Sequence, residues 1–157
     1  GGNGMNLIVC LDDNGGMMFG GRRQTRDRLV NRHILEMTKG HLIMTEGSAK
    51  MFRALPEEVE KDGVSAEDTE ALRRMAEQIR VEPDPLSAAG PGDFVFDEDM
   101  PPGRFADRIR TLVICRWNRV YPADLWFDLD LPGPWTRRSV QNITGSSHDP
   151  VTIEVYE

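Results

Sequence analysis

The stretch LIVCLDDNGGMMFGGRRQTRDR, residues 7–28, decides the fold and also raises the question of function. Its first five residues are all apolar, which is typical of a central strand covered on both faces. The acidic and glycine residues that follow predict a turn. Arg22, Arg23, Arg26 and Arg28 then crowd into the end of the stretch. Two interpretations stay open: a solvated entry into a helix, or a loop that closes over an anionic ligand.

Composition limits what else the chain can do. Its 157 residues predict one domain, 5–157, with residues 1–4 interpreted as an expression scar before a native start at Met5. The net charge of -7 argues against an extended nucleic-acid-binding surface, which needs a basic face. No apolar run approaches the roughly 18 residues of a membrane span, and no signal peptide precedes Met5. We therefore expect a cytoplasmic protein without membrane contact.

The sequence gives little indication of a metal site. Cys10 and Cys115 lie inside apolar runs, where they are expected as buried strand residues that could be neighbours in one sheet. Two cysteines without matching histidines do not make a zinc site. The carboxylates at 97–99, with Asp128 and Asp130, could hold a divalent cation, but a solvated acidic loop is the commoner explanation. No metal is expected.

Strand and helix patterns alternate along the chain. Apolar spacing predicts a helix from Asp27 to Met37 that stops at Gly40, and a buried strand at 41–45. Ser48 is expected to cap a short helix to Phe52, residues 56–63 to be acidic and exposed, and Ser65 to begin a helix in a capping box with Asp68. Further strands are predicted at IRVEPDP, DFVF, TLVICRW, DLWFDLDL, WTRRSVQNIT and PVTIEVYE, with short helical stretches at LSAAGPG and GRFADRI.

This order predicts an α/β fold: a single three-layer domain with a mostly parallel central sheet and an antiparallel C-terminal hairpin. The apolar C-terminal segment VTIEVY could pair within that sheet or extend across a homodimer. The sequence does not distinguish between pairing within the sheet and pairing across a homodimer.

The chain resembles the dihydrofolate reductase family over nearly its whole length. MNLIVCLDDNGGMMFGG (5–21) is similar to that family's opening strand and flexible loop, and ILEMTKGHLIMTEGSAKMF (34–52) to its helix, turn and second strand. IRVEPDPLSAAGPGDFVFDEDM (79–100) resembles the segment leading to its cofactor glycines. The closing LPGPWTRRSV and SSHDPVTIEVYE resemble its terminal hairpin. The resemblance implies the reductase fold.

The functional positions of that family are altered here. Where it carries a glycine pair beside the dinucleotide phosphates, this chain has Asp97-Glu98-Asp99, whose charge would repel a pyrophosphate. The family's cationic phosphate clamp becomes 45–48, which contains Glu46. The pterin-binding carboxylate should fall near Leu29, and the nearest acid is Asp27. We therefore expect the fold without ordinary NADPH binding and with no cofactor.

Three motifs remain that a plain scaffold does not need: 22–27, 116–124 and 145–149. In the expected fold all three lie at one end of the sheet, outside the carboxyl ends of the parallel strands, where ligands bind. Arginines there would contact an anion, and aromatic side chains would stack. Each motif also has a plain explanation, as helix entry, packing or hairpin turn. The predicted ligand-binding residues are Arg22, Arg23, Arg26, Asp27, Arg116, Trp117, Asn118, Arg119, Tyr121, Ser146 and Ser147.

The leading hypothesis is a protein that binds a small anionic ligand, a nucleotide or phosphate-bearing metabolite, in a remodelled cleft. A second makes His148, which lies beside hydroxyls and glycine, the general acid or base of a phosphate-ester or RNA/nucleotide hydrolase. A third is an NADPH-dependent reductase of the dihydrofolate type. A fourth is a non-catalytic module whose arginines bind an acidic partner protein. The sequence leaves open whether the protein is an enzyme.

Overall fold

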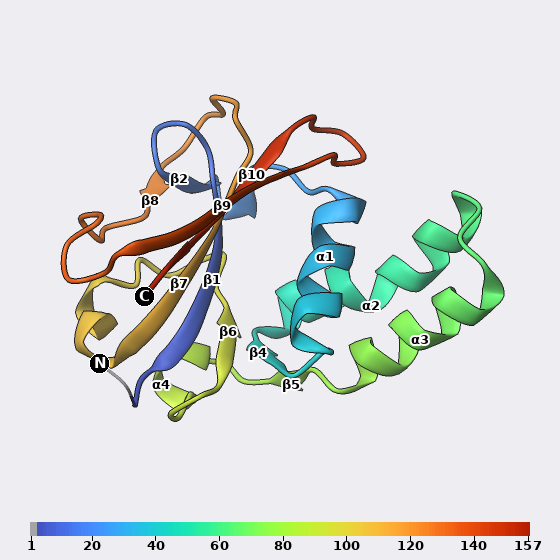
Figure 1. The fold of residues 1–157 in the computed structure, drawn as a ribbon, viewed down its shortest axis with the longest axis horizontal. Coiled ribbons are helices and arrows are strands. Elements are labelled where there is room, and N and C mark those ends of the chain that lie inside the picture. The colour runs from blue at the N-terminus through green and yellow to red at the C-terminus, as the bar shows by residue number, and fades with distance from the viewer. Residues whose placement is uncertain (1–2) are drawn as a thin grey trace.

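A computed structural model describes residues 3–157. The fold is built on a seven-stranded sheet, with the long helices on one side of it (Figure 1). The strand order is β5-β4-β6-β1-β7-β10-β9. Pairs from β5 to β7 are parallel, and β10 is antiparallel to both β7 and β9. The predicted α/β class, with a mostly parallel sheet and an antiparallel C-terminal end, is therefore confirmed. The strands are β1 Met5–Leu11, β4 Leu42–Met44, β5 Arg80–Val81, β6 Phe94–Phe96, β7 Ile109–Arg116, β9 Arg137–Ile143 and β10 Val151–Tyr156.

Strand β1 is apolar throughout because both faces of the sheet are covered at its position. Ile8 faces the cluster under the long helices, whereas Leu7 and Val9 face the opposite cluster. Cys10 lies beside Cys115 of β7 in the parallel register, both as free thiols. The expectation that the two cysteines are strand neighbours is confirmed.

Three helices, α1 Arg28–Thr38, α2 Glu46–Lys61 and α3 Ala66–Glu77, lie together beside the sheet (Figure 1). The hydroxyl of Ser65 accepts from the amide N–H of Asp68, as the capping-box pattern predicted. The expected short helix at 48–52 is wrong. Thr45 caps α2 instead, and the helix continues through Pro56, because Phe52, Leu55 and Val59 bury one continuous face.

The other face of the sheet is covered by shorter elements. Helix α4 Pro85–Ala88 and the 3₁₀ helix η1 Gly103–Arg108 supply Leu86 and Phe105 to the second apolar cluster. A small separate sheet has the order β3-β2-β8, formed by β2 Gly16–Phe19, β3 Arg22–Arg23 and β8 Leu125–Trp126. Part of the loop expected after β1 is therefore a hairpin. The strand predicted at 124–131 shrinks to β8, which pairs with β2 rather than with the main sheet.

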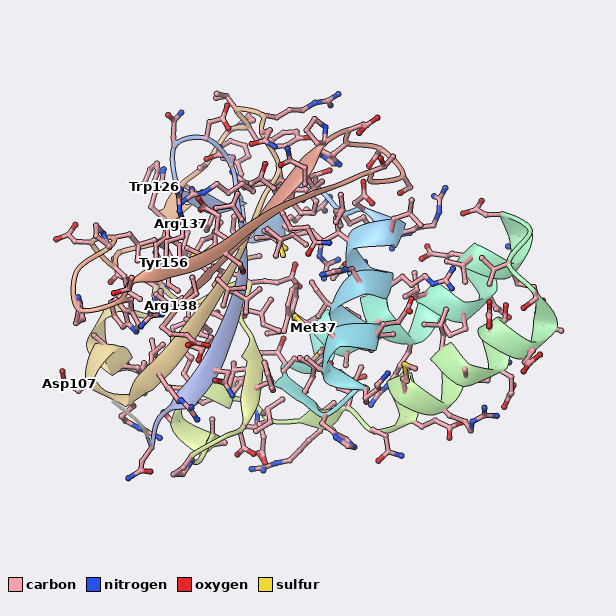
Figure 2. All side chains as sticks on the ribbon, in the orientation of Figure 1. Met37, Asp107, Trp126, Arg137, Arg138 and Tyr156 are labelled. Carbon is pink, nitrogen blue, oxygen red and sulfur yellow. The ribbon has the colours of Figure 1, made fainter. Side chains whose placement is uncertain are left out.

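The C-terminal segment lies inside the sheet. β10 is hydrogen-bonded between β7 and β9, so VTIEVY pairs within its own chain. Arg137 of β9 lies opposite Tyr156 of β10, and Figure 2 shows both on the side of the molecule away from the helix that carries Met37. Among the described residues, no helix is long and apolar enough to cross a membrane.

Candidate functional site

The parallel strands end at one common edge, and each is followed by a polar or aromatic residue. Asp12 follows β1, Thr45 follows β4, Asp97 follows β6 and Trp117 follows β7. Since these strands run the same way, their next residues meet at the edge where ligands bind in open α/β sheets. The candidate site is built from this edge and from the segments that cross it.

Asp27 joins the start of α1 to the β9–β10 hairpin. Its buried carboxylate caps the helix by accepting from the backbone N–H groups of Leu29 and Val30. It also accepts from the backbone N–H groups of Ser146, Ser147 and His148 at 2.8, 2.8 and 3.1 Å. Burial opposes the charge of this carboxylate, but the hydrogen bonds outweigh it and hold the pKa of Asp27 well below its usual range.

His148 continues this network into the interior. Its Nδ1 lies 3.1 Å from Oδ2 of Asp27, and its Nε2 lies 2.7 Å from the hydroxyl of Tyr121. The ring of Trp117 stacks beside it at 4.6 Å between centroids. Only 4% of His148 is exposed. Because both ring nitrogens are engaged and the ring is buried, the local geometry favours a structural role for His148. It joins the β9–β10 hairpin to the start of α1 and to the segment after β7.

The serines of the hairpin turn serve the same junction. The Ser146 hydroxyl accepts from the backbone N–H of Arg28 and donates to Asp27. The Ser147 hydroxyl donates to Asp27 or to the carbonyl of Arg26. These contacts bring motifs 22–27 and 145–149 together.

The motif at 116–124 divides between two faces of the sheet. Trp117 and Tyr121 join the His148 network, whereas Arg116 alternates to the opposite face and pairs with Glu154 of β10. Asn118, in the left-handed conformation at φ 59°, donates to the carbonyl of Pro150 and to the Thr152 hydroxyl. Arg119 is exposed, and its carbonyl accepts from the N–H of Asp13. Arg116 therefore lies apart from the other residues predicted to bind a ligand.

A small, partly open space, the inner cavity, lies against the arginine segment, with residues 23–26 in its wall. Its volume of about 20 Å³ is enough for a group the size of one water molecule. Residues from both sides of the edge line it, among them Gln24, Asn31, Phe96, Asp97 and Trp117. Among the described residues, neither Oε1 of Gln24 nor Oδ2 of Asp97 has a hydrogen-bond partner, although both atoms are buried. The inner cavity is therefore lined by residues with unused acceptor capacity.

Asp97 is the most perturbed carboxyl group of this edge. Its Oδ1 accepts from the backbone N–H groups of Asp99 and Met100, but only 5% of the residue is exposed. Burial raises the pKa of Asp97 to about 7, and the charges of Asp99 and Glu98 add to that rise. Asp97 is thus a carboxyl group whose charge would be stabilised by a donor entering the cavity.

A second, open space, the outer cleft, adjoins the inner cavity. It has a volume of about 470 Å³ and lies between the β2–β3 hairpin and the first turn of α2, with Arg22, Thr45, Gly47, Ser48 and Asp99 in its wall. Arg23 and Glu98 line both spaces. The ion pair of these two residues therefore stands between the cavity and the cleft.

Glu98 is held as a bound anion would be held. Its carboxylate accepts from Nε and Nη2 of Arg23 at 2.8 and 2.9 Å, and from the hydroxyl of Ser48 at 2.6 Å. Arg23 also donates to the carbonyl of Gly47. Bidentate pairing of this kind is the strongest form of carboxylate recognition by arginine. The chain thus fills an anion-binding arrangement with one of its own side chains.

The remaining arginines of the opening stretch differ in their partners. Arg26 pairs with Glu58, and Arg28 pairs with Asp62 at 2.8 Å, both on α2 or at its end. Arg22 is exposed and has no ion-pair partner within residues 3–157. Arg22 is therefore a cation at the outer cleft that the fold itself does not neutralise.

Sequence reasoning missed several of the residues that shape this site. Gln24, Asn31 and Met51 line the inner cavity, and Glu98 was interpreted as a charge that repels phosphate or as part of an acidic loop that could hold a cation. The signal available for Asp97 and Glu98 was their position directly after a buried parallel strand. Nothing in the local pattern indicates that Glu98 would turn toward an arginine 75 residues earlier.

With this edge and its strand order established, the fold is that of dihydrofolate reductase. A solved structure of dihydrofolate reductase from Enterococcus faecalis, complexed with NADP(H) and RAB-propyl, matches 98% of this chain and 95% of its own. The TM-score is 0.53 and the sequence identity 12%, which shows the fold alone. No protein-family model matches the chain, and neither does any curated protein. The resemblance predicted from the sequence is confirmed at the level of the fold.

The segment after β6 lacks the glycine pair that the reductase resemblance implied beside the pyrophosphate of a dinucleotide, and carries Asp97, Glu98 and Asp99 instead. A glycine pair would let a phosphate approach the backbone after β6, but here the Asp97 side chain is buried against the cavity and Glu98 fills the adjoining position on Arg23. No group of residues suited to holding a metal ion occurs in the described part of the chain.

Proposed function

We propose that the protein binds a small anionic ligand, a nucleotide or another phosphate-bearing metabolite, at the outer cleft. The observation that carries the proposal is the arrangement of Arg23 and Ser48 around the carboxylate of Glu98. A phosphate can also accept a bidentate pair of hydrogen bonds from arginine and carries more charge, so it could replace this carboxylate on the same donors.

Two further features favour an anion at this place. Helix α2 begins here, with Thr45 as its cap and Gly47 in its first turn, so its positive end faces the cleft. Arg22 adds an unneutralised cation on the facing hairpin. The predicted residues Arg22 and Arg23 are kept in the proposed site, and Gly47 and Ser48 are added to it.

The other predicted residues support the site from behind. Asp27, Trp117, Tyr121, Ser146, Ser147 and His148 form the network that fixes the start of α1 and the segment 22–27 in front of it. Arg26 lines the inner cavity but is paired with Glu58. Arg116, Asn118 and Arg119 are left out of the proposed site. Hydrolysis through His148 stays a prediction, tested by whether His148→Ala abolishes turnover of a phosphate ester.

The test is a thermal-shift titration of the wild-type protein with inorganic phosphate, AMP, NADPH and dihydrofolate. A ligand at 100 times its dissociation constant should stabilise the native state by about 2.7 kcal/mol, a shift of several degrees. We expect phosphate or AMP to raise the midpoint, and Arg23→Ala to abolish the rise.

The matched control is Arg73→Ala. Arg73 lies on α3, where it pairs with Glu70 at 2.7 Å, and it is not among the residues that line the outer cleft. Its loss should therefore leave the thermal shift unchanged. A shift by NADPH or dihydrofolate alone would contradict the proposal in favour of a reductase. No shift with any of the four compounds would also contradict it, and would favour a protein-interaction module.

A further inference from the structure

The inner cavity holds a polar arrangement that the proposed anion at the outer cleft does not use. Asp97 is 95% buried, since only 5% of it is exposed, and its Oδ2 has no partner among the described residues. Oε1 of Gln24 is a second buried acceptor without a hydrogen-bond partner among the described residues. Two acceptors without donors are costly in a protein interior, and a carboxylate is the costlier of the two.

Both residues line the cavity, which has the size of one small polar group. Its volume of about 20 Å³ accommodates a water molecule or a group of similar size, such as an ammonium head. The aromatic residues Phe96 and Trp117 also line it, and aromatic faces are favourable neighbours for a cation. A small cationic donor would therefore fit the cavity in size and would have Asp97, Gln24 and two aromatic residues in its wall.

The arginines in the wall do not supply this donor. Arg23 is held by Glu98, and Arg26 by Glu58. Each guanidinium is thereby neutralised by a carboxylate other than Asp97. Asp97 directly precedes Glu98 in the sequence and lines the same cavity as the Arg23–Glu98 pair.

We propose that the inner cavity is a subsite for an amine, so that the ligand of this protein is an amino-bearing phosphate or similar zwitterion. Its anionic end replaces Glu98 on Arg23 and Ser48, and its ammonium group donates to Asp97 and Gln24. This inference rests on the proposed function, because it takes the anion site as given. An ammonium group beside Asp97 would place a positive charge after β6, where the reductase resemblance implied a negatively charged phosphate.

Two probes of nearly equal size distinguish the anion site from the amine subsite. They are 2-aminoethyl phosphate and ethyl phosphate, of which only the first carries an ammonium group. Binding to the wild-type protein is measured by calorimetry at pH 8, which is above the raised pKa of Asp97. We expect 2-aminoethyl phosphate to bind about tenfold more tightly, the effect of one added charge-assisted hydrogen bond. Equal affinities would overturn the amine subsite and leave the anion site standing. Binding of neither probe would overturn the proposed function and the inference with it.

The variant Asp97→Asn should bring the two affinities within about twofold of each other, because it removes the charge. Asparagine keeps an Oδ1 that can accept from the N–H groups of Asp99 and Met100, so the turn is preserved. The control Asp13→Asn makes the same change at an exposed carboxylate and should retain the preference. A preference that survives in Asp97→Asn would overturn the subsite.

Discussion

The carboxylate of Asp27 lies 3.1 Å from Nδ1 of His148, a residue 121 positions later in the chain. This contact ties the start of the first helix to the turn of the last hairpin. Through Nε2, His148 also reaches Tyr121 in the segment after β7. Three motifs that are distant in sequence therefore meet in one buried network, and the arginine segment 22–26 is held in place at its C-terminal end by Asp27.

Asp27→Asn should destabilise the protein by roughly 2–3 kcal/mol at pH 7, because the hydrogen bonds to a charged acceptor are weakened. The folded state holds the pKa of Asp27 below its ordinary value of 3.8, so this stabilisation is present above about pH 4 and is lost as the pH falls further. Urea unfolding at pH 7 and pH 3 measures the difference between wild type and variant. It should shrink at the lower pH, and a difference that grows on acidification would contradict the assignment.

Gly145→Ala should disrupt the same network by steric conflict. A Cβ at this position would meet Oδ2 of Asp27 and lie 2.5 Å from the carbonyl oxygen of His148. We expect a loss of roughly 1–3 kcal/mol, seen as a lower thermal midpoint. Gly47→Ala is the control, since the nearest neighbour of its new Cβ would be the Thr45 hydroxyl at 3.9 Å. Equal effects of the two substitutions would show that the crowding at Gly145 is relieved at little cost.

Tyr121→Phe removes the hydroxyl that lies 2.7 Å from Nε2 of His148. The ring nitrogen is left buried without that partner, and we expect a loss of about 1–3 kcal/mol in the free energy of unfolding. Tyr156→Phe provides the comparison, because the Tyr156 hydroxyl makes no side-chain hydrogen bond in the described structure. Chemical denaturation of both variants at pH 8 should show the larger loss for Tyr121, and the reverse order would argue against the network.

Glu98→Gln should strengthen the binding of inorganic phosphate. The wild-type carboxylate competes for Arg23 and Ser48, and the neutral amide competes less well. We expect a severalfold lower dissociation constant by calorimetry, together with a small loss of stability from the weakened ion pair. Weaker phosphate binding in this variant would mean that Glu98 supports the ligand rather than standing in for it.

Asp97→Asn should change how stability depends on pH. The folded state raises the pKa of Asp97 from 3.8 to about 7, so the wild type loses stability as the pH rises between these values. At about 1.4 kcal/mol per pH unit, the loss is about 4 kcal/mol at most. In urea unfolding, the free energy of unfolding of the variant relative to the wild type should therefore be greater at pH 8 than at pH 4. Parallel profiles would contradict the shifted pKa.

Local patterns in the sequence determined the elements whose cause is local. The apolar run at 7–11 predicted β1 because a strand covered on both faces needs no polar positions. Ser65 with Asp68 predicted the start of α3, because capping involves residues three apart. The long α2 was missed because its continuation past Phe52 depends on a buried face that only the packed helices supply.

Tertiary structure alone decided the chemistry of the site. The sequence placed arginines near the ligand edge, but whether an arginine is free or neutralised depends on carboxylates that come from elsewhere in the chain. Glu98 reaches Arg23, Glu58 reaches Arg26, and Glu154 takes Arg116 on the opposite face. Burial likewise leaves Oδ2 of Asp97 without a hydrogen-bond partner among the described residues, while Asp13 is exposed. Charge pairing and desolvation are properties of distances in space, and residue order fixes those distances only through the fold.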